Sequence, residues 1–507
     1  MKWTEKIQLP LQTLSLVAAF MVWVILSALL PLIREEIALT PGQAAWVTAV
    51  PVILGSLLRI PLGFWTNRYG ARLNFTLSFL ALILPVGWIS IADSFADLMV
   101  GGLLLGISGA TFSIGVTSLP KYYPKHRHGA VNGIYGMGNA GTALTTFLAP
   151  VAAVEIGWRA TVQLYLVLLA VFALANFLLG DRREPKVTAS LSEQVKAVCK
   201  NEKLWLLSLF YFITFGSFVA FTVYLPNFLV SHFALDKVDA GLRTAGFIVL
   251  ATLARPLGGW LSDRWNPFGV LMFVFGGLAF SGVLLSFSLS IELFTAGALA
   301  VAVCAGLGNG AVFKLAPLYF SRQAGIVNGI VSAMGGMGGF FPPIILTALY
   351  GMTGHYAIGF MALSEFALVS LVLVIWLFYQ DQLRLASTIL EHTIEGILIT
   401  DANGIIRSVN PAFTAVTGYS AEEAIGKRPN ILKSGRQDRQ FYEDMWRSLR
   451  EKGYWQGEIW NRRKNGDIYP EWLSITAIKN ENGEVQYYAG MFSDISGKRA
   501  PNPASGE

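Results

Sequence analysis

Apolar stretches long enough to cross a membrane follow one another through the first three quarters of the chain. Each holds about 20 residues with few charges, which as a helix spans roughly 30 Å of hydrocarbon. Polar and charged residues gather in the short segments between them. The pattern predicts twelve membrane-spanning helices, at residues 11–33, 43–66, 73–92, 97–118, 129–152, 160–180, 204–230, 240–261, 267–290, 293–318, 325–350 and 356–379.

Composition and charge agree with an all-α membrane protein. Of 507 residues, 54% are hydrophobic and only 14% are charged, which is low for a soluble domain. Lysine and arginine gather in alternate loops, which predicts cytoplasmic termini and a multi-pass protein in the lipid bilayer of a bacterial cytoplasmic (inner) membrane. This bias explains most of the net charge of +6, so the charge does not indicate a nucleic-acid partner.

An internal repeat divides the apolar region into two halves. "RIPLGFWTNR" begins at Arg59, and "RPLGGWLSDR" begins at Arg255, 196 residues later. The same shift carries "GAVNGI" at Gly129 onto "GIVNGI" at Gly325. Because six spans separate the copies, the halves share one orientation and are parallel repeats. The predicted units are a first six-helix half, 1–180, a cytoplasmic linker, 181–203, and a second six-helix half, 204–380.

Two arginines lie inside apolar spans, at equivalent positions of the repeat: Arg59 and Arg255. A charge near the centre of a membrane helix costs about 2.5–3.5 kcal/mol, so it usually faces the protein interior and marks a pathway. The alternatives are a structural ion pair or a side chain extended towards the cytoplasm, but the one carboxylate in the interior of any predicted span is Glu365. A guanidinium binds small oxyanions through paired N–H groups and stays charged. The pair therefore predicts an anion site between the halves.

Two further polar residues extend the predicted site. Lys314, in "GNGAVFKLAP", adds a third cation, and because a desolvated lysine can lose its proton it is the candidate coupling residue. Asn139, in "GMGNAG", can complete the anion site with its amide. The glycines around Asn139, and those of the repeated segment 325–339, let helix backbones approach closely.

Both halves carry a similar loop after their second span. The first copy reads Gly63-x-x-x-Asn67-Arg68-x-Gly70-x-Arg72, and the second repeats part of it as Gly259, Asp263 and Arg264. The pattern resembles the loop signature of the major facilitator superfamily, with Asn67 where that family usually has aspartate. The resemblance implies two six-helix halves that rock against each other. It also implies a gating role, with helix-end anchoring as the alternative, for Arg68, Arg72, Asp263 and Arg264.

The glycine-rich segments of the fifth and eleventh spans, together with Arg59 and Arg255, resemble the nitrate/nitrite porter family. The likeness covers roughly residues 10–380. It implies that nitrate binds between the two arginines, beside Asn139. Aromatic residues in "YFITFGSF" and "GATFSIG" also match the family, and the expected substrate-binding residues there, with ordinary packing as the alternative, are Tyr211, Phe215 and Phe112.

The residues alone indicate a small anion, and the resemblance implies nitrate, with nitrite as a second substrate. Lys314 resembles the branch of the family that takes up nitrate together with protons, so proton symport is the expectation. Nitrate/nitrite exchange, a nitrate receptor, and transport of a small carboxylate such as formate or oxalate stay open as alternatives. The sequence has no acid motif or metal-ligand cluster, so we expect no enzyme activity, no metal and no cofactor for transport.

After Gln380 the chain becomes mixed and charged. Leucines and isoleucines at helical spacing predict a connecting helix over 381–396. Alternating segments separated by Asn-Gly turns then predict a five-stranded antiparallel sheet, with helices near 411–425 and 438–452 on one face. The expectation is an α+β domain over 397–498, followed by a disordered tail, 499–507.

"VNPAFTAVTGYSAEEAIGK", "WQGEIWNRRKNGDIYPEWLSI" and "FSDIS" resemble a PAS sensory domain with its C-terminal motif. The resemblance implies a small ligand and an output that acts on the transporter or on a separate partner protein. The ligand is unknown. The run "YWQGEIWNRRKNGD" is similar to flavin-binding PAS domains, which makes FAD the candidate cofactor, with Trp455 and Asn461 near its ring. A cofactor-free PAS fold, with these residues in the core or at a dimer surface, is the favoured interpretation.

Overall fold

The computed structural model describes residues 6–186, 191–235, 237–287, 290–320, 323–353 and 355–498. The chain forms two compact units, Met1–Trp376 and Leu377–Glu507. The expected tail, 499–507, lies outside the described residues, as do four residues of the expected linker, 187–190.

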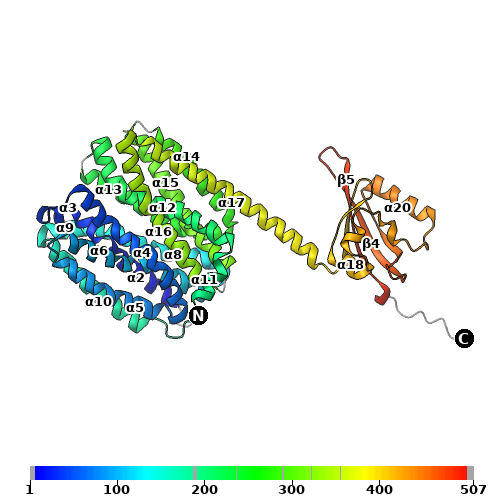
Figure 1. The fold of residues 1–507 in the computed structure, drawn as a ribbon, viewed down its shortest axis with the longest axis horizontal. Coiled ribbons are helices and arrows are strands. Elements are labelled where there is room, and N and C mark those ends of the chain that lie inside the picture. Colours follow the sequence, from blue (N-terminus) through cyan, green and yellow to red (C-terminus); the bar gives the residue numbers. More distant parts are fainter. Residues whose placement is uncertain are drawn as a thin grey trace. The chain divides into compact units, whose positions relative to one another are not determined.

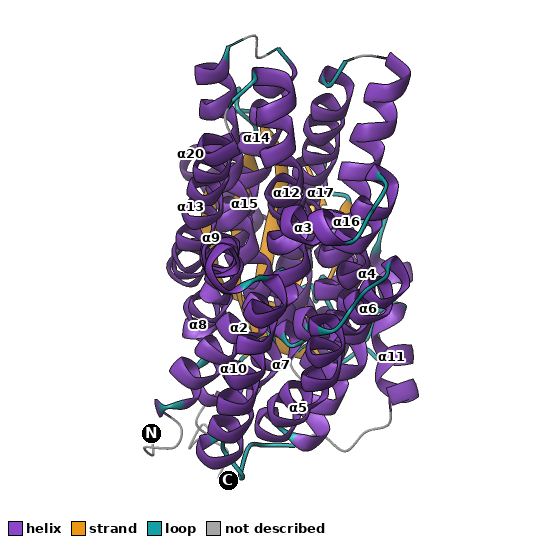
Figure 2. Cartoon of the chain, turned by 90° about the vertical axis from the view of Figure 1, so that its left-hand side faces the viewer, coloured by secondary structure: helices purple, strands orange, loops and turns teal. Residues whose placement is uncertain are grey.

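The first unit is a bundle of helices that lie alongside one another (Figure 2). The first half contains α2 (Gln8–Trp23), α3 (Ile25–Glu36), α4 (Pro41–Tyr69), α5 (Ala71–Ser90), α6 (Phe95–Ala110), α7 (Phe112–Ser118), α8 (His128–Gly136), α9 (Ala140–Ile156) and α10 (Trp158–Leu179). The second half contains α12 (Glu202–Phe233), α13 (Lys237–Arg264), α14 (Pro267–Ser286), α15 (Ile291–Tyr319), α16 (Ala324–Thr353) and α17 (Ala357–His392), preceded by α11 (Leu191–Cys199) in the linker.

The apolar helices of the described residues correspond to the predicted spans. Among the described residues, eleven helical segments are long and apolar enough to cross a membrane, and the twelfth, in α16, is described as a shorter apolar stretch, Ala324–Phe340. Some spans are interrupted: the first divides at Val24, the fourth at Thr111, and the fifth at a 3₁₀ turn, Met137–Asn139. The fifth-span interruption falls in the glycine-rich segment, where glycine weakens the helix.

Glycines join the two halves at two equivalent helix crossings. A Cβ atom on Gly63 of α4 would overlap the carbonyl oxygen of Gly325 of α16, and a Cβ on Gly259 of α13 would overlap that of Gly129 of α8. Only glycine allows such an approach. Both crossings lie towards the ends of α4 and α13 that carry the basic loops, and we call this side of the unit the basic side. In Figure 1 the first half is blue to cyan and the second half is green to yellow.

The second unit contains the predicted five-stranded antiparallel sheet. Its order is β2-β1-β5-β4-β3, and a core of residues such as Phe413, Leu473 and Phe492 lies against it. The predicted helix 411–425 is divided, because Gly418 adopts a positive φ of 78°. The strands are β1 (Gly396–Asp401), β2 (Ile406–Val409), β3 (Tyr454–Arg462), β4 (Ile468–Lys479) and β5 (Val485–Asp494), and the helices are α18 (Pro411–Thr417), α19 (Ala421–Ala424) and α20 (Arg439–Lys452).

Candidate anion-binding site

Arg59 and Arg255 meet at one aromatic pair inside the membrane unit. Each is only 1% exposed, and they come from α4 and α13, in opposite halves. The guanidinium carbons lie 5.4 Å and 4.9 Å from the ring centre of Phe112. They lie 5.3 Å and 6.0 Å from the ring centre of Phe215. The predicted convergence of the two arginines is therefore present.

The two guanidinium groups differ in their hydrogen bonds. Arg59 donates through Nη1 to the carbonyl of Ser332 on α16, at 2.6 Å, and through Nε to that of Gly109, at 3.2 Å. Arg255 donates through Nη2 to the Tyr211 hydroxyl, at 3.1 Å. Its Nε and Nη1 are buried and have no hydrogen-bond partner among the described residues. A buried charged group with unused donors is costly unless an anion accepts from it.

Stacked aromatic rings surround the arginines. The rings of Tyr211 and Phe215 are nearly parallel, with centres 5.0 Å apart, and Phe112 lies 6.4 Å from each. Phe313 on α15 closes the cluster edge-on, 4.7 Å from Tyr211, and Tyr135 on α8 stacks at 5.7 Å on Phe112. The sequence analysis missed Phe313 and Tyr135. Phe313 directly precedes Lys314, and Tyr135 lies four residues before Asn139, so their position was the available signal.

Gly136 on α8 provides the space that the Arg255 side chain fills. A Cβ atom at this position would overlap Nε and Cδ of Arg255. Gly136 and Ser332 are equivalent positions of the 196-residue repeat, and the carbonyl of Ser332 accepts from Arg59. Each arginine thus extends from its own half onto the glycine-rich helix of the other half.

Asn139 is buried, but the structure joins it to neither arginine. It is 2% exposed and lies in the 3₁₀ turn Met137–Asn139. Its Oδ1 has no partner among the described residues, and no hydrogen bond there links it to Arg59 or Arg255. A role in the anion site stays a prediction for Asn139.

Lys314 does not act as a third cation beside the arginines in this arrangement. Its Nζ pairs with Asp263 Oδ1 at 2.5 Å and donates to the carbonyl of Lys125 at 2.7 Å. Asp263 also accepts from the backbone N–H groups of Gly129 and Ala130, at 3.0 Å and 2.6 Å. The physical reason is position: Lys314 is near the basic-side end of α15, within reach of a carboxylate that stabilises it. Asp263 therefore joins α13 to the start of α8, across the boundary between halves.

The other predicted gating residues make contacts within their own halves. The Arg68 guanidinium carbon lies 5.8 Å from the Tyr69 ring centre, and that of Arg264 lies 5.5 Å from the Trp260 ring centre. Arg72 Nε donates to the carbonyl of Phe177 on α10, at 2.8 Å. Of the four predicted gating residues, Asp263 is the one that these described contacts place across the halves.

Comparison with known proteins decides the family. The Major Facilitator Superfamily model matches residues 13–324 and 207–421, and a PAS domain model matches residues 394–497. A protein named "Nitrite extrusion protein" from Bacillus subtilis (strain 168) is 66% identical over 380 residues, which cover 75% of this chain and 96% of that protein. The chain belongs to the nitrate/nitrite porter family of the major facilitator superfamily.

Other relatives of this porter agree. A "Probable nitrate transporter NarT" from Staphylococcus epidermidis is 52% identical over 370 residues, covering 73% of the porter and 96% of that protein. The solved structure of the human organic anion transporter MFSD10 (TETRAN) matches the fold with a TM-score of 0.62 at 15% identity, covering 73% of the porter and 99% of that chain. The porter is thus a bacterial multi-pass membrane transporter and not an enzyme.

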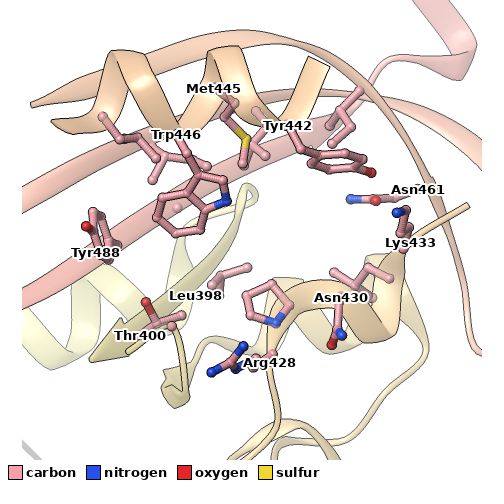
Figure 3. A pocket seen from close by; sticks show the side chains of 18 of the residues that line it. Leu398, Thr400, Arg428, Asn430, Lys433, Tyr442, Met445, Trp446, Asn461 and Tyr488 are labelled. Carbon is pink, nitrogen blue, oxygen red and sulfur yellow. The ribbon is translucent and has the colours of Figure 1, made fainter. Parts of the chain in front are cut away.

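The PAS domain of the porter has an open cavity of about 940 Å³ between its sheet and α20. Figure 3 shows Tyr442, Met445 and Trp446 of α20 on one side of the cavity, with Arg428 and Asn430 opposite. Apolar side chains and a group of basic ones both line the cavity; they include Leu398, Ile459, Leu473, Arg428, Lys433 and Arg450. This lining suits a ligand with an apolar body and an anionic end.

The two predicted cofactor residues separate in the structure. Asn461 lines the cavity and is 7% exposed. Trp455 instead packs edge-on against Phe441, with ring centres 5.6 Å apart, as part of the hydrophobic core. The reason is the packing of α20 across β3, where Phe441 meets the indole ring.

A buried carboxylate that the sequence analysis missed lies in the same cavity. Glu471 on β4 is 1% exposed, accepts from Asn461 Nδ2 at 2.8 Å, and accepts from the Tyr469 hydroxyl at 2.7 Å. Burial raises the pKa of Glu471 to about 7, despite the hydrogen bonds from Tyr469 and Asn461, which lower it. The signal was a glutamate on the apolar face of a strand, between the alternating positions of Tyr469 and Leu473.

Glu471 makes the stability of the PAS domain depend on pH. Its folded pKa of about 7 exceeds the ordinary value of 4.5, so the folded state holds the proton more tightly and stability falls as pH rises from about 4.5 to 7. The loss reaches up to about 3 kcal/mol above pH 7. We expect hydrogen exchange of the β4 and β5 amides in the full-length porter to accelerate across this window.

Glu471→Gln should remove most of this pH dependence, and the exposed Glu481→Gln should leave it unchanged. Equal pH profiles for the native porter and the Glu471→Gln variant would contradict the assignment.

Proposed function

We propose that this porter moves nitrate, and also nitrite, across the bacterial cytoplasmic membrane by alternating access, with the anion held between Arg59 and Arg255. The observation that carries the proposal is the buried Arg255 guanidinium, which has two unused donors and no described carboxylate partner. A planar trigonal oxyanion matches such a fork and can be reached by one arginine from each half. The printed names of the relatives supply nitrate and nitrite as the anions.

The aromatic rings complete this proposed site. Tyr211 fixes the Arg255 guanidinium through its hydroxyl, and Phe112 and Phe215 lie against both arginines. Ring faces stabilise the cations without competing for their N–H groups. The site therefore keeps its charge while presenting few groups that would hold nitrate too tightly for release.

Uptake of a monoanion into a negative interior needs a driving reaction. Moving one negative charge inwards costs about 2.3 kcal/mol per 100 mV. We propose proton symport, with Lys314 as the coupling residue, because opening of the basic side would separate Lys314 from the Lys125 carbonyl of the other half and expose an amine that can exchange its proton. Exchange of nitrate for nitrite is the second candidate, favoured by the relative named for nitrite extrusion.

We also propose that the PAS domain faces the cytoplasm, with both chain termini, and adjusts transport or signals to a separate protein. The supporting observation is α17, one uninterrupted helix over Ala357–His392 that contains the last membrane span and ends shortly before β1. FAD is the proposed PAS ligand: the cavity residues Arg428 and Lys433 suit its phosphates, and Asn461 suits a ring amide, but Trp455 takes no part. Visible absorbance of the purified porter tests this assignment.

The test of the proposed function is nitrate uptake into proteoliposomes at fixed membrane potential. Uptake is compared with and without a pH gradient, with and without internal nitrite, for the whole chain and for a chain ending at Gln380. If the porter is a proton symporter controlled by its PAS domain, the pH gradient drives nitrate uptake, and truncation at Gln380 changes the uptake rate. Uptake that requires internal nitrite and ignores the pH gradient would establish exchange instead. Saturable nitrate binding without flux would establish a receptor.

A further inference from the structure

Two buried asparagines outside the predicted site occupy equivalent positions in the two halves. Asn132 lies on α8 and Asn328 on α16, and each is 2% exposed or less. Asn132 Nδ2 donates to the carbonyl of Phe313 on α15, at 3.2 Å. Asn328 Nδ2 donates to the carbonyl of Val116 on α7, at 2.9 Å. Each half thus donates one such hydrogen bond to the other, and we call these contacts the two asparagine bridges.

Each bridge uses a carbonyl that its own helix cannot fully pair. In an α-helix a carbonyl accepts from the N–H group four residues later. Four residues after Phe313 is Pro317, and four residues after Val116 is Pro120. Proline has no backbone N–H, so both carbonyls lack that donor. The asparagine amide of the opposite half supplies one in each case.

The asparagines are not fully satisfied themselves. The Oδ1 atoms of Asn132 and Asn328 are both buried and have no partner among the described residues. An unpaired buried amide oxygen is unfavourable, and a role in packing alone does not explain why both asparagines keep one. When the halves separate on the basic side, water can reach the amide and the carbonyl alike. The bridges therefore stabilise the closed arrangement only modestly, as a transporter that must reopen requires.

The bridges also lie beside the two arginines. Gly133, which follows Asn132, packs on the backbone of Arg255, and Gly329, which follows Asn328, packs on that of Arg59. The Phe313 ring, whose carbonyl forms one bridge, lies 5.4 Å from Phe112. The contact that closes the halves is thus continuous with the packing around the candidate anion site.

We propose that Asn132 and Asn328 are positioning residues that hold the two halves closed on the basic side by capping the carbonyls that Pro317 and Pro120 leave free. The proposal concerns the closed arrangement and does not depend on which anion is carried.

The test measures the open fraction of the full-length porter in lipid nanodiscs by electron–electron double resonance. Spin labels are placed through Tyr69→Cys and Trp265→Cys, at exposed positions on the basic-side ends of α4 and α13, with Cys199→Ser to prevent extra labelling. We expect Asn132→Ala to raise the basic-side-open fraction about five- to tenfold, the effect of losing one buried hydrogen bond. Asn328→Ala should act in the same way.

Proline replacement separates a bridge from simple disruption of packing. Pro317→Ala gives the Phe313 carbonyl a donor in its own helix, so adding Asn132→Ala in that background should change the open fraction less than about twofold. The matched control is Asn74→Ala, which removes a buried asparagine bond to Gly70 within one half and should leave the open fraction unchanged.

An Asn132→Ala variant that folds with an unchanged open fraction would overturn the proposal. So would an equal effect of Asn132→Ala with and without Pro317→Ala, or an Asn74→Ala effect as large as that of Asn132→Ala. If Asn132→Ala fails to fold, Asn132→Ser is measured instead, once with native Pro317 and once with Pro317→Ala, and gives the same comparison.

Discussion

Arg255→Lys is expected to lower nitrate transport, measured as kcat/KM in proteoliposomes, by about 100-fold or more. The substitution keeps the positive charge but replaces the planar fork by a point charge. In the structure the Arg255 guanidinium donates through Nη2 to Tyr211, and its Nε and Nη1 have no described partner, so they are available to an anion. A lysine cannot hold the tyrosine and a bidentate oxyanion together. Arg59→Lys should act similarly, because that guanidinium also holds Ser332.

The matched control for Arg255→Lys is Arg243→Lys. Arg243 is on the same helix, but it is exposed and its guanidinium pairs with Asp239. Its replacement should change kcat/KM less than about threefold. Nitrate transport at the native rate by a folded Arg255→Lys variant would exclude the guanidinium fork as the anion-binding group.

Gly136→Ala is expected to lower nitrate transport by about tenfold to 100-fold although it adds one methyl group. That Cβ would overlap Nε and Cδ of Arg255, so the guanidinium must leave its place beside Phe112 and Tyr211. Overpacking of this kind typically costs about 1–3 kcal/mol. The measurement is again kcat/KM in proteoliposomes, together with nitrate affinity of the purified porter, which should fall in parallel.

Gly246→Ala is the control for added volume. Gly246 is on α13, as Arg255 is, and nothing lies within 4 Å of a Cβ built there. Alanine should be neutral at this position or slightly stabilising for the helix. If Gly136→Ala transports as well as Gly246→Ala, then the position of the Arg255 side chain does not limit binding.

Much of the fold follows from local pattern. Apolar length predicts the twelve spans, the 196-residue repeat predicts two parallel halves, and Asn-Gly turns with alternating segments predict the antiparallel PAS sheet. The meeting of Arg59 and Arg255 also follows, because equivalent helices of a two-fold repeat face each other across its axis. These features depend on period and symmetry, which one sequence displays directly.

The remaining features depend on contacts between distant segments. Lys314 is expected beside the arginines but pairs with Asp263, since the register of α15 against α13 cannot be read from either helix alone. Trp455 is expected in the PAS cavity but meets Phe441, because the placement of α20 decides which face of β3 is covered. The asparagine bridges could not be predicted for the same reason: Asn132 and Pro317 are far apart in sequence, and neither residue alone indicates the contact.

The most direct test of the central claim is nitrate counterflow in proteoliposomes that contain the native porter, with Arg59→Lys and Arg255→Lys porters measured alongside. Vesicles loaded with unlabelled nitrate are diluted into labelled nitrate, and nitrite or formate is added as competitor. We expect saturable entry of labelled nitrate, competition by nitrite but not by formate, and little entry through either lysine variant. Entry that formate suppresses as well as nitrite does, or that survives both substitutions, would contradict a nitrate site built from the two arginines.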